Sequence, residues 1–169
     1  MTRGNEMKFK LNQWVHDPMN GIGCVKSFEV MTIDGVRGEF ILLSFTQPNF
    51  VARIPMDRIK ERGVRPLSTK AEIKRALEVL KVKPKSYRML WSQKSAVHET
   101  KLLSGDLQQI AEVVRDLHKG YSSIDSDQSY TEYQLYQKSL NRLNREIELV
   151  EGLDALAAEK KILSALKVA

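Results

Sequence analysis

The stretch Val25–Thr46, VKSFEVMTIDGVRGEFILLSFT, decides the fold of the first part of this chain. Residues 25–33 have the composition of a β-strand and lead into Asp34-Gly35. Both of these residues tolerate the positive φ angles that a two-residue hairpin turn requires. Residues 39–46 then supply a return strand, so the stretch predicts an antiparallel β-hairpin.

The flanking residues continue the two-residue period of this hairpin. Apolar and polar side chains alternate from Phe9 to Val15, and Gly21-Ile22-Gly23 indicates a turn between strands. Gln47-Pro48-Asn49 indicates a further turn, which precedes a strand over Phe50–Pro55. Four or five short antiparallel strands within about 60 residues predict a small Tudor-like or SH3-like β-barrel.

After Pro66 the apolar period changes from 2 to 3.6, which predicts an all-α region. Thr69 and Glu72 have the spacing of a capping box, and the apolar residues that follow them describe an amphipathic helix that Pro84 ends. About five helices are expected. The fold class is therefore α+β, with a β-barrel domain at residues 1–66 and a helical domain at residues 67–169. The predicted inward residues of the first, third, fourth and fifth helices are Ile73, Ala76, Leu77 and Leu80; Leu107, Ile110, Ala111, Val114 and Leu117; Tyr136, Leu140, Leu143 and Ile147; and Leu156, Ile162 or Leu163, and Leu166.

The second helix is expected from about Tyr87 to Leu103. At about 100° per residue, Trp91 points away from the apolar stripe of this helix and lies on the side of His98 and Tyr87. The stripe itself is predicted to consist of Met89, Leu90, Ala96, Val97 and Leu103.

Composition limits the class of protein. The chain has 169 residues, enough for one ordinary or two small domains, and a single cysteine, Cys24, so that no intrachain disulfide can form. No run approaches the roughly 18 apolar residues of a membrane span. These features predict a cytoplasmic protein without a membrane partner.

Catalytic signatures are missing from the sequence. His16, His98 and His118 are scattered and have no zinc-binding spacing, and there is no P-loop or nucleophile elbow. Glu146 and Glu148 are interpreted as ordinary helix-surface carboxylates. The chain is therefore expected to be no enzyme and to need no metal or cofactor.

The stretch Lys70–Lys94 carries the most concentrated charge. Eight lysines and arginines stand there against two glutamates, a net charge of +6 that equals the net charge of the whole chain. A basic surface beside an aromatic ring is typical of nucleic-acid binding, although a solvated helical face has the same composition.

Trp91 and Arg53 each allow two interpretations. Trp91 either packs against a neighbouring helix or the β-domain, or it stacks on or between bases while lysines hold phosphates. Arg53 lies on the strand face opposite Ala52 and Ile54, where it either faces solvent or contacts a partner.

Several segments together resemble the CarD/CdnL family of bacterial RNA polymerase-binding transcription regulators, from about Phe9 to Leu166. They are Leu90-Trp91-Ser92, Leu103-Ser104-Gly105-Asp106, Ala111-Glu112-Val113-Val114-Arg115-Asp116-Leu117, Ser129-Tyr130-Thr131-Glu132 with Leu135-Tyr136, and Gly63-Val64-Arg65-Pro66-Leu67. The chain departs from the family pattern at Asp17, which replaces a tyrosine, at Gln93 and Lys94, which replace two arginines, and at Met31, where some members have an arginine.

The resemblance implies a Tudor-like domain that docks on the RNA polymerase β subunit and a helical domain that contacts promoter DNA without reading its sequence. It implies that Trp91 enters the minor groove at the upstream edge of the transcription bubble. It also implies a protein that is a monomer when bound to polymerase. The residues expected to bind DNA are Trp91, Lys94, Arg88 and Lys85, and those expected to bind polymerase are Arg53 and Val51. The alternative is a β-barrel protein-interaction adaptor whose helical part is a scaffold or dimerisation element.

Overall fold

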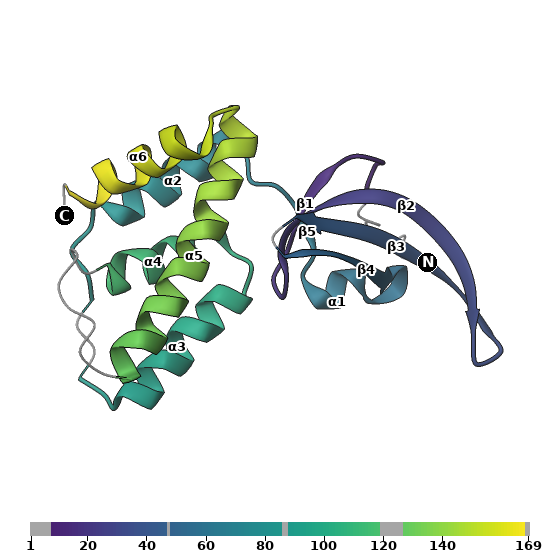
Figure 1. Cartoon of the computed structure of the whole chain (residues 1–169), viewed down its shortest axis with the longest axis horizontal. Helices are drawn as coiled ribbons and strands as arrows, with labels where there is room; N and C mark the ends of the chain where they lie inside the picture. The colour runs from purple at the N-terminus through teal and green to yellow at the C-terminus, as the bar shows by residue number, and fades with distance from the viewer. Residues whose placement is uncertain (1–7, 47, 86–87, 119–126, 168–169) are drawn as a thin grey trace, which may run out of the picture. The chain divides into compact units, whose positions relative to one another are not determined.

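The computed structural model describes residues 8–46, 48–85, 88–118 and 127–167, with the side chains of 127–129 outside the description. The chain divides into two compact units, residues 1–67 and 68–169, the first built on a sheet and the second all-helical (Figure 1). This is the α+β class predicted from the change of period.

The first unit contains one antiparallel sheet with the strand order β4-β3-β2-β1-β5. The sheet is curved and open, and has a barrel-like form (Figure 1). Its elements are β1 (Trp14–Asp17), β2 (Gly21–Ile33), β3 (Val36–Thr46), β4 (Asn49–Pro55), a 3₁₀ turn η1 (Met56–Arg58), α1 (Ile59–Arg62) and β5 (Arg65–Pro66).

The predicted hairpin is confirmed by β2 and β3. Ile33 pairs with Val36, and the two residues between them, Asp34 and Gly35, have φ angles of 52° and 80°. Apolar side chains alternate on these strands and on β4, so that one face of the sheet is buried. The core of the first unit consists of Phe9, Val15, Val25, Ile41, Leu43, Phe45, Ile54, Ile59 and Val64.

The turn predicted at Gly21-Ile22-Gly23 is wrong, because these residues begin β2 and pair with β1. A glycine is needed at position 23 because a side chain would not fit there, and not because the chain reverses direction. A Cβ atom on Gly23 would lie 2.8 Å from Cε1 of the buried Phe45 ring. A glycine therefore allows the strand to approach the aromatic core.

The structure explains Asp17, which stands where the pattern that the chain resembles has a tyrosine. Its side chain is 0% exposed and receives two hydrogen bonds from Arg62, Nε to Oδ1 at 3.1 Å and Nη2 to Oδ2 at 2.8 Å. The same carboxylate accepts from the Met19 backbone N–H at 3.1 Å and from Asn20 Nδ2 at 2.8 Å. Asp17 thus joins the turn after β1 to α1.

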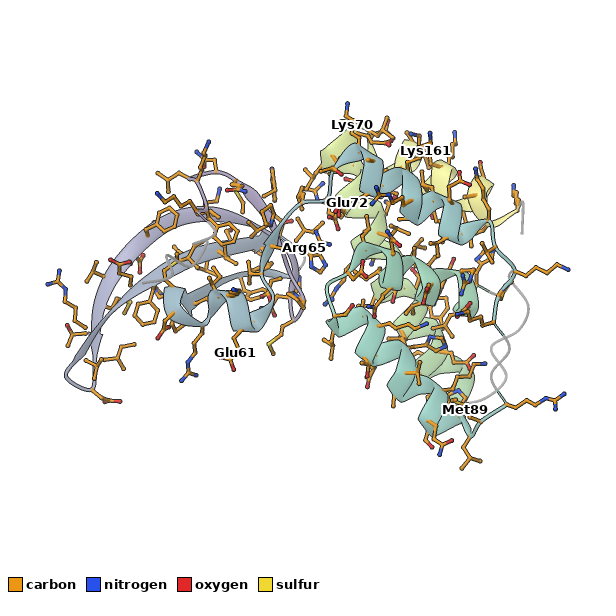
Figure 2. All side chains as sticks on the ribbon, turned by 180° about the vertical axis from the view of Figure 1, so that it is seen from behind. Glu61, Arg65, Lys70, Glu72, Met89 and Lys161 are labelled. Atoms are coloured by element: carbon orange, nitrogen blue, oxygen red, sulfur yellow. The ribbon has the colours of Figure 1, made fainter. Side chains whose placement is uncertain are left out.

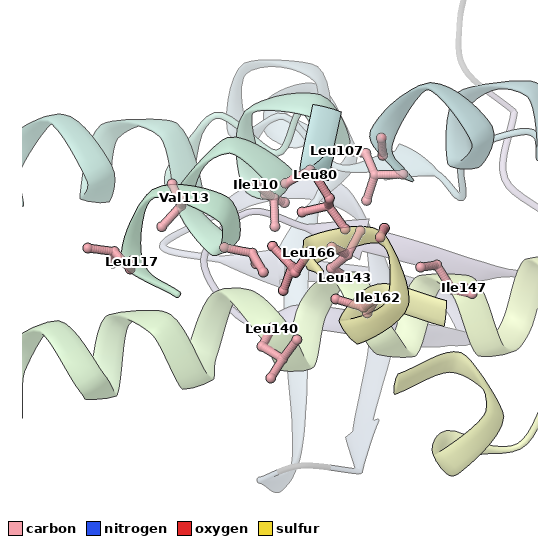
Figure 3. Close-up of a cluster of buried hydrophobic side chains, with 14 of the residues drawn as sticks. Leu80, Leu107, Ile110, Val113, Leu117, Leu140, Leu143, Ile147, Ile162 and Leu166 are labelled. Atoms are coloured by element: carbon pink, nitrogen blue, oxygen red, sulfur yellow. The ribbon is translucent and has the colours of Figure 1, made fainter. Parts of the chain in front are cut away.

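The second unit contains α2 (Lys70–Leu80), α3 (Trp91–Leu103), α4 (Leu107–Leu117), α5 (Asp127–Glu151) and α6 (Ala155–Leu166). The predicted capping box of α2 is present, since Thr69 accepts from the Glu72 backbone and Glu72 accepts from the Thr69 backbone. Figure 3 shows the core that these helices enclose. Its buried members include Ile73, Ala76, Leu80, Leu107, Ile110, Val114, Leu143, Ile147 and Ile162.

The prediction for α3 is wrong about its buried side. Leu90 is 71% exposed and precedes the helix, and Leu103 is 51% exposed. The buried residues of α3 are instead His98 and Leu102, with Trp91 half-buried seven residues before His98. A polar residue, His98, on the inner face weakens the apolar period, so periodicity alone indicates the wrong side of this helix. The expected start at about Tyr87 is also wrong: Tyr87 itself lies outside the described residues, but residues 88–90 are not helical and α3 begins at Trp91.

Two further predictions are wrong. Leu156 is 63% exposed, while Ile162 and Leu166 are buried as expected. Glu146 is 0% exposed rather than on the surface, and its Oε1 accepts from the backbone N–H of Ser68 at 2.7 Å and from the Ser68 hydroxyl at 2.6 Å. This carboxylate fixes the entrance to α2 against α5.

Candidate nucleic-acid and protein interfaces

The segment before α3 carries two of the predicted DNA contacts, Lys85 and Arg88, and a buried carboxylate on α4 holds the main chain at Lys85. The Asp116 side chain is 0% exposed, and its Oδ1 accepts from the Lys85 backbone N–H at 3.0 Å and from Arg115 Nε at 2.8 Å. Because its main chain is held, the exposed Lys85 side chain projects from a defined position. Sequence reasoning did not single out Asp116, because an aspartate on a helix is most often on the surface.

Trp91 is the first residue of α3 and lies against α5. Its indole Nε1 donates to Glu132 Oε1 at 3.0 Å, and the side chain is half-buried. The ring thus has one polar edge bound to a neighbouring helix while part of its surface stays in solvent. Packing against a neighbouring helix was one of the two interpretations of this residue, and the structure combines it with partial exposure.

The surroundings of Trp91 combine positive charge with exposed apolar surface. Arg88 is exposed and Lys94 is half-buried. Met89 and Leu90 are 42% and 71% exposed, and Figure 2 shows Met89 at the end of the helical unit where α3 begins. Exposed apolar groups of this size beside cations are typical of a binding surface. We call Lys85, Arg88, Met89, Leu90, Trp91 and Lys94 the α3 entry surface.

His98 lies on the buried side of α3, one helical turn beyond Lys94. Burial lowers the pKa of His98 below its ordinary value of 6.5. Asp116 and Glu132 act in the opposite direction, whereas the positive charges of Lys101 and Lys94 also lower the pKa. His98 is therefore neutral at pH 7, and no cationic imidazole adds to the positive charge of the α3 entry surface.

Two polar contacts hold the rest of α3 in place. Lys101 Nζ lies 2.6 Å from Glu112 Oε2 on α4, and Arg142 Nη1 on α5 donates to the Leu102 carbonyl at 3.4 Å. Helix α3 is thus attached to both neighbours along its length. A side chain at its first turn sits on a fixed support, which a contact surface requires.

In the sheet unit, Val51 and Arg53 lie on the exposed face of β4, opposite the buried Ile54, as the alternation predicts. Val51 is 53% exposed. Arg53 Nε donates to Glu29 Oε2 on β2 at 3.0 Å, and this hydrogen bond lowers the pKa of the Glu29 carboxyl. The two site residues therefore share one face of one strand, with Glu29 orienting the guanidinium group.

The DNA-binding and polymerase-binding sets belong to different units. Val51 and Arg53 share one face of β4, whereas the four predicted DNA contacts lie within one stretch of the chain, residues 85–94. Among the described residues, no three histidine, cysteine, aspartate or glutamate side chains gather as a metal ion would require. No helix in the described part of the chain has the length and apolar character to cross a membrane.

Residues 75–163 match the family model of the CarD C-terminal domain, which is more than half of the chain. The chain is also similar to the putative transcription factor YdeB of Bacillus subtilis (strain 168). The two are 22% identical over 156 residues, which cover 92% of this chain and 98% of that protein. The matched region contains the whole α3 entry surface, together with Asp116 and Glu132, which accept hydrogen bonds from Lys85 and Trp91. The chain therefore belongs to the CarD/CdnL family of transcription factors.

Proposed function

We propose that this chain docks on the β subunit of RNA polymerase and stabilises the promoter open complex by inserting Trp91 into the minor groove at the upstream edge of the bubble. The observation that carries the proposal is the partly exposed Trp91 side chain at the first turn of α3, bonded to α5 and close along the chain to Lys85, Arg88 and Lys94. Residues 1–66 are then the polymerase-interacting domain and residues 67–169 the DNA-contacting domain. The protein acts in the cytoplasm and is a monomer when bound to polymerase.

The free energy that an inserted aromatic ring can contribute is large enough to change the stability of the open complex. Strand separation at a promoter is close to balanced, and an aromatic side chain inserted at an interrupted stack opposes reannealing by a few kcal/mol at most. A change of about 1.4 kcal/mol alters the ratio of open to closed complex tenfold. The minor groove carries a degenerate code, so the contact needs no particular sequence.

Docking on polymerase compensates for the weakness of the contact between Trp91 and DNA, because it raises the local concentration of this protein at the promoter. A protein held on polymerase by its first unit presents the α3 entry surface to DNA at a high effective concentration. Val51 supplies exposed apolar surface for that docking, and Arg53 supplies a planar cation for a carboxylate on the partner. Because Glu29 already orients the Arg53 guanidinium, little side-chain freedom is lost on binding.

The first test measures the lifetime of open complexes that contain polymerase holoenzyme, a promoter fragment and saturating protein at fixed salt. We expect Trp91→Ala to shorten the lifetime about tenfold and Lys94→Gln to shorten it less. Lys74→Gln, which removes an exposed lysine from α2, is the matched charge control. Equal lifetimes for Trp91→Ala and wild type would refute insertion of the ring.

The second test addresses docking. Arg53→Glu should abolish capture of the isolated β-subunit lobe in a pull-down assay while the protein still folds and unfolds cooperatively on heating. Arg37→Glu changes an exposed arginine outside β4 by the same charge and should retain capture. Retained capture by Arg53→Glu would place the polymerase contact elsewhere on the sheet.

A second candidate function is a protein-interaction adaptor whose helical unit is a scaffold or dimerisation element. The bond between Trp91 and Glu132 favours it, because a tryptophan with a satisfied donor has a structural role without DNA. The adaptor predicts polymerase capture that depends on Arg53, together with open-complex lifetimes that do not respond to Trp91→Ala.

A further inference from the structure

We infer that Glu132 is a positioning residue for Trp91: its carboxylate holds the indole ring in the orientation that enters DNA, and it keeps this hydrogen bond in the complex. The inference rests on the proposed function and assigns a role to a residue on α5, outside the basic stretch. The contact that carries it is the 3.0 Å hydrogen bond from Trp91 Nε1 to Glu132 Oε1.

The chemistry of the indole group makes this single bond decisive. A tryptophan side chain has one donor and no acceptor, and two rotatable bonds set its direction. A hydrogen bond at Nε1 together with the fixed Cα therefore defines both torsions. Since Trp91 is only half-buried, packing alone restrains the ring less than a core position would.

The partner is itself in a defined position. Glu132 lies on α5, a helix of 25 residues whose later turns supply Leu143 and Ile147 to the core. It is half-buried, and its charge acts on the buried His98 of α3. The bond consequently connects the exposed first turn of α3 to a rigid element rather than to a loop, as a precise contact surface requires.

A carboxylate at this place has an electrostatic cost when phosphates approach. Glu132 is negatively charged near a surface whose other charged side chains, Lys85, Arg88 and Lys94, suit a polyanion. If its function were general repulsion of DNA, removing the charge alone would lengthen the open-complex lifetime. If its function is to position the ring, an uncharged acceptor should serve equally well, and only loss of the acceptor should matter.

The test is a pair of variants that separates these roles. Glu132→Gln keeps an oxygen acceptor without the charge, and Glu132→Leu removes the acceptor at similar volume. We expect Glu132→Gln to retain the open-complex lifetime within about twofold and Glu132→Leu to shorten it about three- to tenfold, because the freed ring must be immobilised on binding. Glu99→Gln, an exposed glutamate on α3, controls for the change in net charge.

A double-mutant cycle tests whether Glu132 acts on the open-complex lifetime through the indole N–H of Trp91. Trp91→Phe keeps an aromatic ring but has no N–H group, so Glu132→Leu should have no further effect on lifetime in the Trp91→Phe protein. In NMR spectra of the free full-length protein, Glu132→Leu should move the Trp91 indole N–H resonance and leave that of Trp14 in place. A merely structural role would alter the urea midpoint without this pattern of coupling.

The outcomes are distinct. If Trp91→Ala shortens the lifetime but Glu132→Leu does not, the inference fails and the proposed function stands. Equal effects of Glu132→Leu in the wild-type and Trp91→Phe proteins would also overturn it, because Glu132 would then act on something other than the indole. If Trp91→Ala itself has no effect, the proposed function fails, and the positioning role for DNA fails with it.

Discussion

The buried ion pair between Asp17 and Arg62 permits the sharpest prediction about stability. Replacing Arg62 by methionine removes the guanidinium group and leaves the Asp17 carboxylate fully buried with its charge uncompensated by Arg62. Two hydrogen bonds to a charged group, at about 1.5–3 kcal/mol each, set an upper range of about 3–6 kcal/mol. The Arg62 side chain is 27% exposed, so its guanidinium group is partly hydrated in the parent protein and water can enter beside the methionine in the variant. Both effects reduce the loss of stability below this upper range. We expect a loss of about 2–4 kcal/mol in the free energy of unfolding of the first unit.

Urea denaturation followed by tryptophan fluorescence measures this loss. The measurement uses Trp91→Phe protein, in which Trp14 on β1 is the remaining tryptophan and reports the first unit. Arg58→Met is the matched control, since Arg58 is exposed on η1, and it should change the free energy by less than about 0.5 kcal/mol.

A double-mutant cycle with Asp17→Asn completes the test. The neutral amide still accepts from the Met19 backbone but carries no charge that needs a cation. Arg62→Met should therefore cost clearly less in the Asp17→Asn protein than in the parent. If Arg62→Met and Arg58→Met had the same effect, the pair would not hold α1 to the sheet, and the reasoning would be wrong.

Three other predictions concern stability and pH. Leu143→Ala should lower the free energy of unfolding of the helical unit by about 2–5 kcal/mol, because Leu143 is 0% exposed, whereas Leu156→Ala at a 63% exposed site should change it by less than about 0.5 kcal/mol; urea denaturation compares the two. Because burial lowers the pKa of His98, the unfolded chain binds more protons than the folded one below the ordinary pKa of 6.5. Stability should accordingly be fully present above that pH and fall as pH is lowered through the folded-state pKa, and urea denaturation from pH 7.5 to 5 should give a shallower fall for His98→Gln; an unchanged fall would contradict this. Gly63→Ala should lower the free energy of unfolding by about 1–2 kcal/mol, since Gly63 has a φ of 81° and a Cβ there would lie 3.2 Å from Cγ of Pro18. In thermal unfolding it should be more destabilising than Gly35→Ala, because Gly35 has a φ of 80° but open space around it.

Local patterns determined most of the architecture from sequence alone. The Asp34-Gly35 turn and the Thr69 capping box depend on residues close together in the chain, so their signals survive without knowledge of the fold. The change of apolar period near Pro66 likewise predicted an α+β chain, and the residue pattern of the helical part predicted its family.

The long-range polar contacts of the helical unit, two of them at the candidate site, were decided by the tertiary structure. Trp91 meets Glu132 across 41 positions, Lys85 meets Asp116 across 31, and Ser68 meets Glu146 across 78. In each pair the carboxylate belongs to a residue type that normally lies at the surface, and here it is buried or half-buried. Such a group must find a hydrogen-bond partner, and the partner lies on a different helix or on the segment that leads into one. Periodicity ranks residues by apolar character and so misassigned the inner face of α3. Which polar groups meet depends on how the helices pack, and the sequence does not contain that information in any local pattern.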